Sequence, residues 1–296
     1  MKILVTGSSG TIGSALCTRL IERGHNVLGI DFHPQKWDSR IKTIVCDLRA
    51  TFPKLDFIPD VLVHLAANPF VRASVENPSL ASDNSKMTEN VISYWISNKI
   101  KHFVFGSSRE VYGNQKLEMF SEDNVTGNTE SPYAASKLSS ELKIRKVSAD
   151  TGLTHTIVRF SNVYGRYDFT DRFIPKLLYA LKRNEPFTIY GKDKTLDFTF
   201  IDDCVSGVII IIEKWSNAPE ELNVASGSQH SLEYIVKFAK ELLNSTSKIE
   251  FGDTLIGEVW NFQSDISRMK QLGWGPQTIL EEGLKKAVAY YSSSQQ

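Results

Sequence analysis

Residues 1–13 read MKILVTGSSGTIG and contain a strand signal, a glycine-rich turn and the start of a helix. The apolar run from Lys2 to Val5 predicts a strand, and the apolar spacing from Thr11 to Arg23 predicts a helix. The glycines between them allow a tight turn and let a pyrophosphate approach the backbone, while the helix N-terminus offers free N–H groups to the anion. A strand, a glycine-rich turn and a helix in this order indicate a dinucleotide site. The competing interpretation is a glycine-rich turn without a ligand.

Strand and helix signals then alternate along the chain. Short apolar runs at 26–30, 43–46, 61–65, 102–105 and 156–160 predict strands, and 85–98 and 134–150 predict helices. Continuous apolar strands separated by helices indicate an α/β fold with a doubly wound parallel (Rossmann) sheet covered on both faces.

After about residue 165 the regular alternation of strand and helix signals ends, and short strands and helices follow. A long apolar helix is expected over 205–215. We expect a dinucleotide-binding domain over 1–165, to which about 197–216 return. Residues 166–296 then form a smaller, partly interleaved C-terminal substrate lobe. The final SSSQQ, residues 292–296, is expected to fray.

Composition excludes several classes of function. The chain has 296 residues, with 34 Lys plus Arg against 34 Asp plus Glu, so no basic excess indicates nucleic-acid binding. The N-terminal apolar run is only one strand long, which argues against a signal peptide, and no run approaches a membrane span. The three cysteines, Cys17, Cys46 and Cys204, are odd in number and far apart, which favours reduced thiols, a cytoplasmic location and no metal site.

Asp31 ends the second predicted strand, NVLGID, where an acidic side chain can accept hydrogen bonds from the adenosine ribose. A carboxylate there repels a 2′-phosphate, which favours NAD over NADP; the alternative is a turn residue. Lys36 and Arg40 lie nearby and keep NADP open. Asp47, after the third strand, is a candidate for contact with the adenine amino group.

The stretch SPYAASK, residues 131–137, places Tyr133 and Lys137 one turn apart if 134–150 is a helix. An ammonium that close favours the phenolate and lowers the tyrosine pKa. Such a tyrosine can take a proton from a sugar hydroxyl while a hydride leaves the same carbon for a nicotinamide. Upstream, HFVFGSSREVYG runs from a strand into a loop at the edge where such sheets bind ligands, so Ser108 is a partner for the reacting oxygen.

These motifs together resemble the extended short-chain dehydrogenase/reductases of the nucleotide-sugar epimerase and dehydratase family. TGSSGTIG is similar to the family's TGxxGxxG loop, HLAAN at 64–68 to its fourth-strand motif, and GSSREVYG, SPYAASK and VRFSNVYG to its catalytic and substrate-edge motifs. Downstream, LDFTFIDD, LNVASG, and LGWGP with LEEG are similar to its substrate lobe. The resemblance covers nearly the whole chain.

The resemblance implies roles for single residues. Tyr133 would be the acid/base, Lys137 its electrostatic partner and a ligand of the nicotinamide ribose, and Ser108 the hydroxyl that orients the substrate. Asp202 and Asp203 are expected to cap the helix at Val205. The implied NAD-binding residues are Gly7, Gly10, Thr11, Ile12, Gly13, Asp31, Asp47, Leu48, Leu65, Ala66, Ala67, Asn84, Tyr133 and Lys137. The implied substrate-binding residues are Ser108, Arg109, Glu110, Asn162, Arg172 and Lys192.

The residues after Ser108 bear on the reaction. Dehydratases of the family use an Asp-Glu pair here, but this chain has Arg109 and Glu110, and arginine does not give up its proton at neutral pH. Glu110 is either a structural acceptor or a group acting on the sugar. Arg109 either binds a uronate carboxylate or points outward into solvent.

The resemblance fails at one position. Many relatives have a diphosphate-binding arginine where this chain has Leu196. Lys192, Lys194, Arg166, Arg172 and Arg268 are the candidates to replace it.

Three functions remain open. The leading hypothesis is an NAD-dependent 4-epimerase of a UDP-hexose or UDP-hexuronate that acts through a 4-keto intermediate. The alternatives are a UDP-glucuronate decarboxylase or a dehydratase/reductase on the same scaffold, and a regulator that binds a dinucleotide without turnover. Relatives often dimerise through two helices, here 85–98 and 134–150, so a homodimer is expected.

Overall fold

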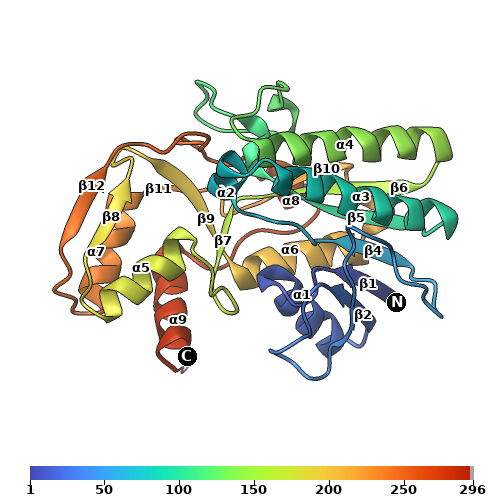
Figure 1. Cartoon of the computed structure of the whole chain (residues 1–296), viewed down its shortest axis with the longest axis horizontal. Helices are drawn as coiled ribbons and strands as arrows, with labels where there is room; N and C mark the ends of the chain where they lie inside the picture. The colour runs from blue at the N-terminus through green and yellow to red at the C-terminus, as the bar shows by residue number, and fades with distance from the viewer. Residues whose placement is uncertain (294–296) are drawn as a thin grey trace.

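The computed structural model describes residues 1–293 and is built around one seven-stranded sheet (Figure 1). The strand order is β10-β6-β5-β4-β1-β2-β3, and every neighbouring pair is parallel. The predicted doubly wound parallel sheet is therefore confirmed. Its strands are β1 (Lys2–Thr6), β2 (Asn26–Asp31), β3 (Lys42–Val45), β4 (Val61–His64), β5 (His102–Ser108), β6 (Thr154–Phe160) and β10 (Glu221–Val224).

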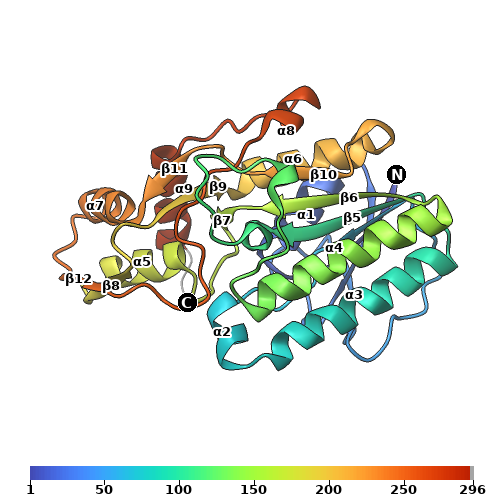
Figure 2. The ribbon, with the colours of Figure 1, turned by 90° about the horizontal axis from the view of Figure 1, so that it is seen from above.

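Helices cover both faces of this sheet, which is why strands such as VLVH of β4 are buried throughout (Figures 1 and 2). One face carries α1 (Thr11–Glu22) and α6 (Ile201–Glu213), which pack together. The other carries α2 (Val71–Glu76), α3 (Ser79–Ser97) and α4 (Pro132–Thr151), with α3 and α4 side by side. No helix among residues 1–293 is long and apolar enough to cross a membrane.

A smaller lobe follows, at the left in Figure 1. It holds a three-stranded sheet, β11-β9-β7, and a two-stranded sheet, β12-β8. Its strands are β7 (Asn162–Tyr164), β8 (Phe187–Tyr190), β9 (Thr195–Phe200), β11 (Gln229–Ser231) and β12 (Ile249–Gly252). Its helices are α5 (Phe173–Lys182), α7 (Leu232–Leu242) and α9 (Leu280–Ser293). The short helix α8 (Ser267–Gln271) lies against β10 of the large sheet. Short 3-10 turns span Arg109–Tyr112, Glu122–Asn124 and Trp215–Asn217.

The start of α6 corrects one prediction. This helix begins at Ile201, directly after β9, so Asp202 and Asp203 lie in its first turn and do not cap a helix at Val205. Asp203 instead accepts the backbone N–H groups of Gln277 and Thr278 at 3.0 and 2.9 Å. The aspartate thus anchors a distant loop, a contact that the local pattern does not reveal. At the other end of the chain, α9 includes Ser292 and Ser293 of the tail expected to fray, and 294–296 lie outside the described residues.

A buried ion-pair network joins α4 to the sheet. Arg159 of β6 is 1% exposed, and its guanidinium donates to Glu141 of α4 at 2.8 and 3.1 Å and to Glu221 of β10 at 3.0 Å. Ser107 of β5 donates to the same Glu141 carboxylate at 2.5 Å. Three strands are therefore tied to the helix that carries SPYAASK.

Replacing Arg159 with methionine tests the weight of this network. Arg159→Met leaves the carboxylate of Glu141 buried without its main cation, and losing one partner of a buried ion pair costs about 3–5 kcal/mol. We expect a loss of that size in the free energy of unfolding, measured with urea. Arg145→Met is the matched control, because Arg145 pairs with the same two carboxylates but its side chain is 29% exposed; its loss should be on the order of 1 kcal/mol. Equal losses would contradict the assignment.

Candidate active site

The glycine loop between β1 and α1 is too closely packed for side chains. Gly7 has a φ of 75°, and a Cβ there would lie 2.7 Å from the backbone nitrogen of Ala66. A Cβ on Gly13 would lie 1.9 Å from the carbonyl oxygen of Gly7. The N–H of Gly10 donates to that carbonyl at 3.2 Å and closes the turn. The loop therefore forms only because glycine stands at these positions.

The N-terminus of α1 fits an anion. Its N-cap residue, Gly10, provides no side-chain cap, and its first turn contains no acidic residue. The free N–H groups and the helix dipole therefore favour a pyrophosphate at the turn formed by Thr11, Ile12 and Gly13. The hydroxyl of Thr11 donates to the carbonyl of Tyr167 at 3.2 Å, which ties this turn to the connection between β7 and α5.

Asp31 lies beside this loop, at the end of β2. Its carboxylate accepts the backbone N–H groups of Ser9 and His33, each at 2.9 Å, and so braces the glycine loop. Lys36, one of the nearby cations, lies over the ring of Trp37 at 4.5 Å. The position of Asp31 suits a contact with the adenosine ribose, which stays a prediction.

Charged residues on both sides of β3 are paired with each other. Asp47 pairs with Arg49 at 2.7 Å, and hydrogen bonds from that arginine hold the pKa of the carboxyl below its usual range. Leu48 is buried. Arg40 pairs with Asp38 at 2.7 Å. The contact of Asp47 with an adenine amino group stays a prediction.

The loop after β4 lies against the glycine loop and is held by Asn84. Residues 65–67 are half-buried, and Asn84 of α3 is buried with both amide atoms engaged. Its Oδ1 accepts the N–H of Asn68 at 2.7 Å, and its Nδ2 donates to the carbonyl of Asn68 at 3.1 Å. In this structure Asn84 therefore shapes the loop, and its cofactor contact stays a prediction.

His64, the last residue of β4, is buried, and burial lowers its pKa to about 3. No cluster of metal-ligating side chains occurs within residues 1–293.

The start of α4 is specified by its sequence. Ser131 is the N-cap, its hydroxyl accepts the N–H of Ala134 at 3.2 Å, and Pro132 occupies the first turn. The N–H of Tyr133, which this cap leaves free, donates to Ser74 of α2 at 3.1 Å. The N-cap of α4 and the hydrogen bond to Ser74 together fix the position of Tyr133.

Tyr133 and Ser108 meet at the C-terminal edge of β5. Burial raises the pKa of the Tyr133 phenol, while the guanidinium of Arg172 and a hydrogen bond with the Ser108 hydroxyl act to lower it. The expectation that the neighbouring ammonium leaves this pKa below its usual value is therefore wrong for the protein alone. The cations that act most on the phenol are Arg172 and then Arg109.

Lys137 lies one turn further along α4 and is buried. Its Nζ donates to the carbonyl of Gly106 at 2.7 Å and lies 4.8 Å from the centre of the Phe105 ring. Burial lowers its pKa to about 8, against the opposing effect of Glu141. In the protein alone this lysine thus braces β5.

Arg109 and Glu110 form a buried ion pair immediately after Ser108. Their side chains are 9% and 7% exposed, and Arg109 Nη2 lies 2.8 Å from Glu110 Oε1. Nη2 of Arg109 also donates to Asn162 Oδ1 at 3.3 Å. The alternative that Arg109 points outward into solvent is therefore wrong. The N–H of Glu110 donates to the Ser108 hydroxyl at 3.2 Å, so this turn also positions the serine.

Most candidates to replace the missing diphosphate arginine are already paired. Lys194 is buried and forms an ion pair with Glu258. Arg166 pairs with Asp202. Arg268 pairs with the acidic residues of the 122–124 turn, at 3.4 and 2.6 Å. A diphosphate would have to compete with these carboxylates.

Two candidates remain. Leu196 itself is buried in the core, and Lys192 is exposed on the preceding turn. The side chain of Arg172 forms no hydrogen bond or ion pair with any residue in the described part of the chain, and its charge acts on Tyr133. Arg172 is therefore the cation best placed to meet an anionic ligand near the phenol.

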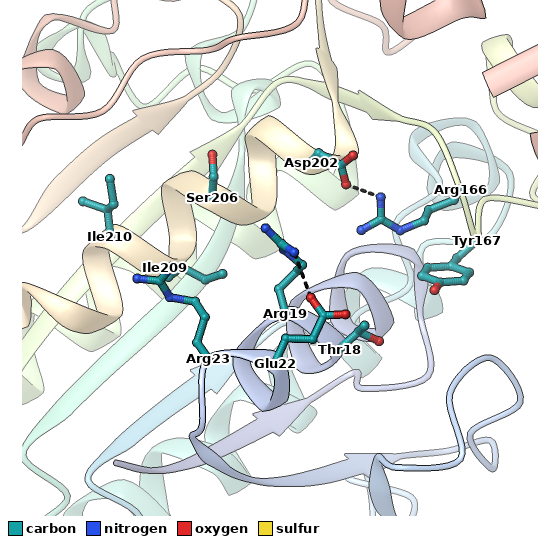
Figure 3. Close-up of a pocket in the computed structure, with 10 residues that line it drawn as sticks. All are labelled: Thr18, Arg19, Glu22, Arg23, Arg166, Tyr167, Asp202, Ser206, Ile209 and Ile210. Carbon is teal, nitrogen blue, oxygen red and sulfur yellow. Dashed lines mark hydrogen bonds and ion pairs between the residues drawn. The ribbon is translucent and has the colours of Figure 1, made fainter. Parts of the chain in front are cut away.

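A groove of about 600 Å³ lies elsewhere, between α1 and α6 (Figure 3). Arg19 pairs with Glu22 there at 2.8 Å, and Arg166 with Asp202. None of the residues proposed for catalysis lines it, and these facing charges neutralise each other.

Several supporting residues were missed by sequence reasoning. Gln35 donates to the carbonyl of Ser8 at 2.9 Å from an irregular loop, where no periodic signal exists. Glu141 stands four residues after Lys137, a helical spacing that could have drawn attention to it. Glu258 lies in an irregular connection, and only tertiary structure brings it to Lys194.

Comparison with known proteins agrees with this geometry. A sequence model of the NAD dependent epimerase/dehydratase family matches residues 3–225. An uncharacterized UDP-glucose epimerase of Bacillus subtilis, YtcB, is 32% identical over 99% of this chain and 98% of its own.

Solved structures show the same fold. UDP-glucose 4-epimerase of Thermotoga maritima, solved with UDP-glucose, is 27% identical, covers 99% of both chains and has a TM-score of 0.90. UDP-glucuronic acid 4-epimerase of Bacillus cereus, solved with UDP-glucuronic acid and NAD, is 27% identical over 99% of both chains, with a TM-score of 0.89. The chain belongs to the NAD dependent epimerase/dehydratase family.

Proposed function

We propose that the protein is an NAD-dependent 4-epimerase of a UDP-linked hexose or hexuronate. The observation that carries this proposal is the meeting of the Tyr133 phenol with the Ser108 hydroxyl at the ligand-binding edge of the sheet. The glycine loop and the open N-terminus of α1 provide the matching dinucleotide site. Similarity to UDP-sugar 4-epimerases over nearly the whole chain supports the same reaction.

The chain's own groups can perform the acid–base chemistry. Ser108 orients the sugar hydroxyl, and the ionised Tyr133 oxygen takes its proton. The positive charge of Arg172 stabilises the phenolate, whereas the effect of Arg109 on the phenol is opposed by that of its partner Glu110. Lys137, one turn along α4 from Tyr133, is the residue that would bind the nicotinamide ribose. Bound NAD would supply the hydride acceptor for C4 and, once the 4-keto sugar has turned over, the hydride donor to its opposite face. Tyr133 then gives its proton back to the C4 oxygen.

A decarboxylase is the second candidate, because Glu110 is retained beside the phenol and acts on its pKa. Dehydration is disfavoured, because the guanidinium of Arg109 does not release a proton at neutral pH. Incubation with UDP-sugars and no added cofactor separates the possibilities. Epimer formation supports the proposal, carbon dioxide from UDP-glucuronate supports the decarboxylase, and cofactor binding without product supports a regulator.

Removing the phenolic oxygen should stop the reaction. Tyr133→Phe is expected to lower kcat by roughly 10²–10⁴-fold, the usual contribution of a positioned acid–base group. Turnover is measured with UDP-glucose, and thermal unfolding checks that the fold is kept. Tyr190→Phe, the same change at a tyrosine 42% exposed on β8, should leave turnover unchanged. Full activity of Tyr133→Phe would refute the acid–base assignment.

A methyl group in the glycine loop should abolish cofactor binding. The Cβ of Gly13→Ala would lie 1.9 Å from the Gly7 carbonyl oxygen, so the loop must move away from the pyrophosphate position. We expect NAD affinity, measured by calorimetry, to fall about 100-fold, or about 2.7 kcal/mol. Gly275→Ala is the control, because nothing lies within 4 Å of its added Cβ. Equal affinities in the two variants would place the cofactor elsewhere.

We also infer that the protein is a cytoplasmic homodimer joined through α3 and α4. The free thiols of its three cysteines support the location. Leu142 of α4 is 58% exposed and Ile96 of α3 is 37% exposed, so these helices present apolar groups that a second copy can cover.

A charge on this face should break the dimer. Leu142→Glu is expected to convert the protein to a monomer, because a carboxylate buried in an apolar interface loses its hydration. Light scattering during size-exclusion chromatography gives the mass. Ile279→Glu, at a site 65% exposed before α9, should not change it. A wild-type mass of one chain would rule out the dimer.

A further inference from the structure

The Arg109–Glu110 pair leaves one donor and one acceptor unused. Arg109 Nη1 and Glu110 Oε2 are buried, and neither has a hydrogen-bond partner. Burial raises the pKa of the Glu110 carboxyl, whereas the charge of Arg109 and the backbone N–H of Val259 act to lower it. Oε2 accepts no hydrogen bond in the described part of the chain. Because buried polar atoms are nearly always hydrogen-bonded, two unmet atoms on one ion pair point to a ligand group that completes them.

The pair also stands next to the reacting end of the site. Arg109 and Glu110 directly follow Ser108, and the charges of both act on the Tyr133 phenol. The same Nη2 of Arg109 that pairs with Glu110 also donates to Asn162, whose Nδ2 donates to the carbonyl of Asp197 at 2.8 Å. A sugar whose C4 oxygen is held by Ser108 and Tyr133 therefore has the substituents next to C4 within the reach of this pair.

The chemistry of the unmet atoms selects the ligand group. A hydroxyl accepts one hydrogen bond and donates another, so it can satisfy Nη1 and Oε2 together. A carboxylate only accepts, so it would leave Oε2 unpaired and place a second anion beside Glu110. The positive charge of Arg109 is already balanced by Glu110, and that of Lys194 by Glu258. Neither of these two cations is free to offset a carboxylate on the sugar, and the unpaired Arg172 is the candidate to bind the diphosphate.

We propose, building on the 4-epimerase function above, that Arg109 and Glu110 form a specificity device for the uncharged hydroxymethyl group of a UDP-hexose. Arg109 Nη1 donates to the hydroxymethyl oxygen, and that hydroxyl donates to Glu110 Oε2. The same pair discriminates against UDP-hexuronates, so Arg109 does not serve as a carboxylate receptor.

Steady-state kinetics with UDP-glucose and UDP-glucuronate test this assignment. The wild-type protein should prefer UDP-glucose by at least about tenfold in kcat/KM, since one misplaced charge outweighs the 1.4 kcal/mol that tenfold represents. Glu110→Gln removes the anion and frees the charge of Arg109. It should shift the ratio of the two kcat/KM values towards UDP-glucuronate by at least about tenfold. Thermal unfolding of each variant checks the fold.

Two controls isolate the contact. Glu122→Gln makes the same change at a carboxylate that is 2% exposed and pairs with Arg268, so it should leave the substrate ratio unchanged. UDP-xylose lacks the hydroxymethyl group, so Glu110→Gln should affect its turnover less than that of UDP-glucose.

A double variant keeps the proposal testable if Glu110→Gln does not fold. Arg109→Gln with Glu110→Gln removes both charges but keeps a donor and an acceptor, so it should still prefer UDP-glucose. A double variant that prefers UDP-glucuronate would overturn the proposal.

The outcomes separate this inference from the proposed function. Wild-type protein that epimerises UDP-glucuronate better than UDP-glucose would overturn the specificity device and leave the 4-epimerase standing. A Glu110→Gln effect equal on both substrates would do the same. Failure of the wild-type protein to epimerise any UDP-sugar would instead remove the proposed function.

Discussion

The buried contact between Glu141 and Arg159 is the interaction on which the site depends. Glu141 projects from α4, whereas Arg159 belongs to β6, and Ser107 of β5 donates to the same carboxylate. Removing one of these charges leaves another in a medium where it cannot be hydrated. The network therefore fixes α4 against the strands, and this places Tyr133 beside Ser108.

The reacting end of the site is dry and charged. Burial raises the pKa of the Tyr133 phenol and lowers that of the Lys137 ammonium, so desolvation opposes the ionised form of both groups. Such a site is organised by pairing: Arg109 with Glu110, and Lys194 with Glu258. Arg172 is the exception, and an anionic ligand would meet it without first displacing a carboxylate.

Local sequence was sufficient for the parallel sheet and for the tight glycine turn between β1 and α1. Apolar runs such as VLVH report burial on both faces, and the close approach of Gly13 to Gly7 admits no side chain, so both features can be read from a few neighbouring residues. The capping prediction for Asp203 failed for the opposite reason. Its partners, Gln277 and Thr278, lie in a distant part of the chain.

Local sequence was enough to give the fold class and the tight glycine turn after β1. It also predicts Ser108, Tyr133 and Lys137 as the catalytic set. Tertiary structure decided where the charges go: the Lys137 ammonium to the Gly106 carbonyl, and the Arg109 guanidinium inward to Glu110. The physical reason is the separation along the chain between the residues that determine each feature. Strand burial and glycine geometry are set within a few residues, whereas the state of a charged group depends on desolvation and on partners that only the folded chain brings within a few ångströms.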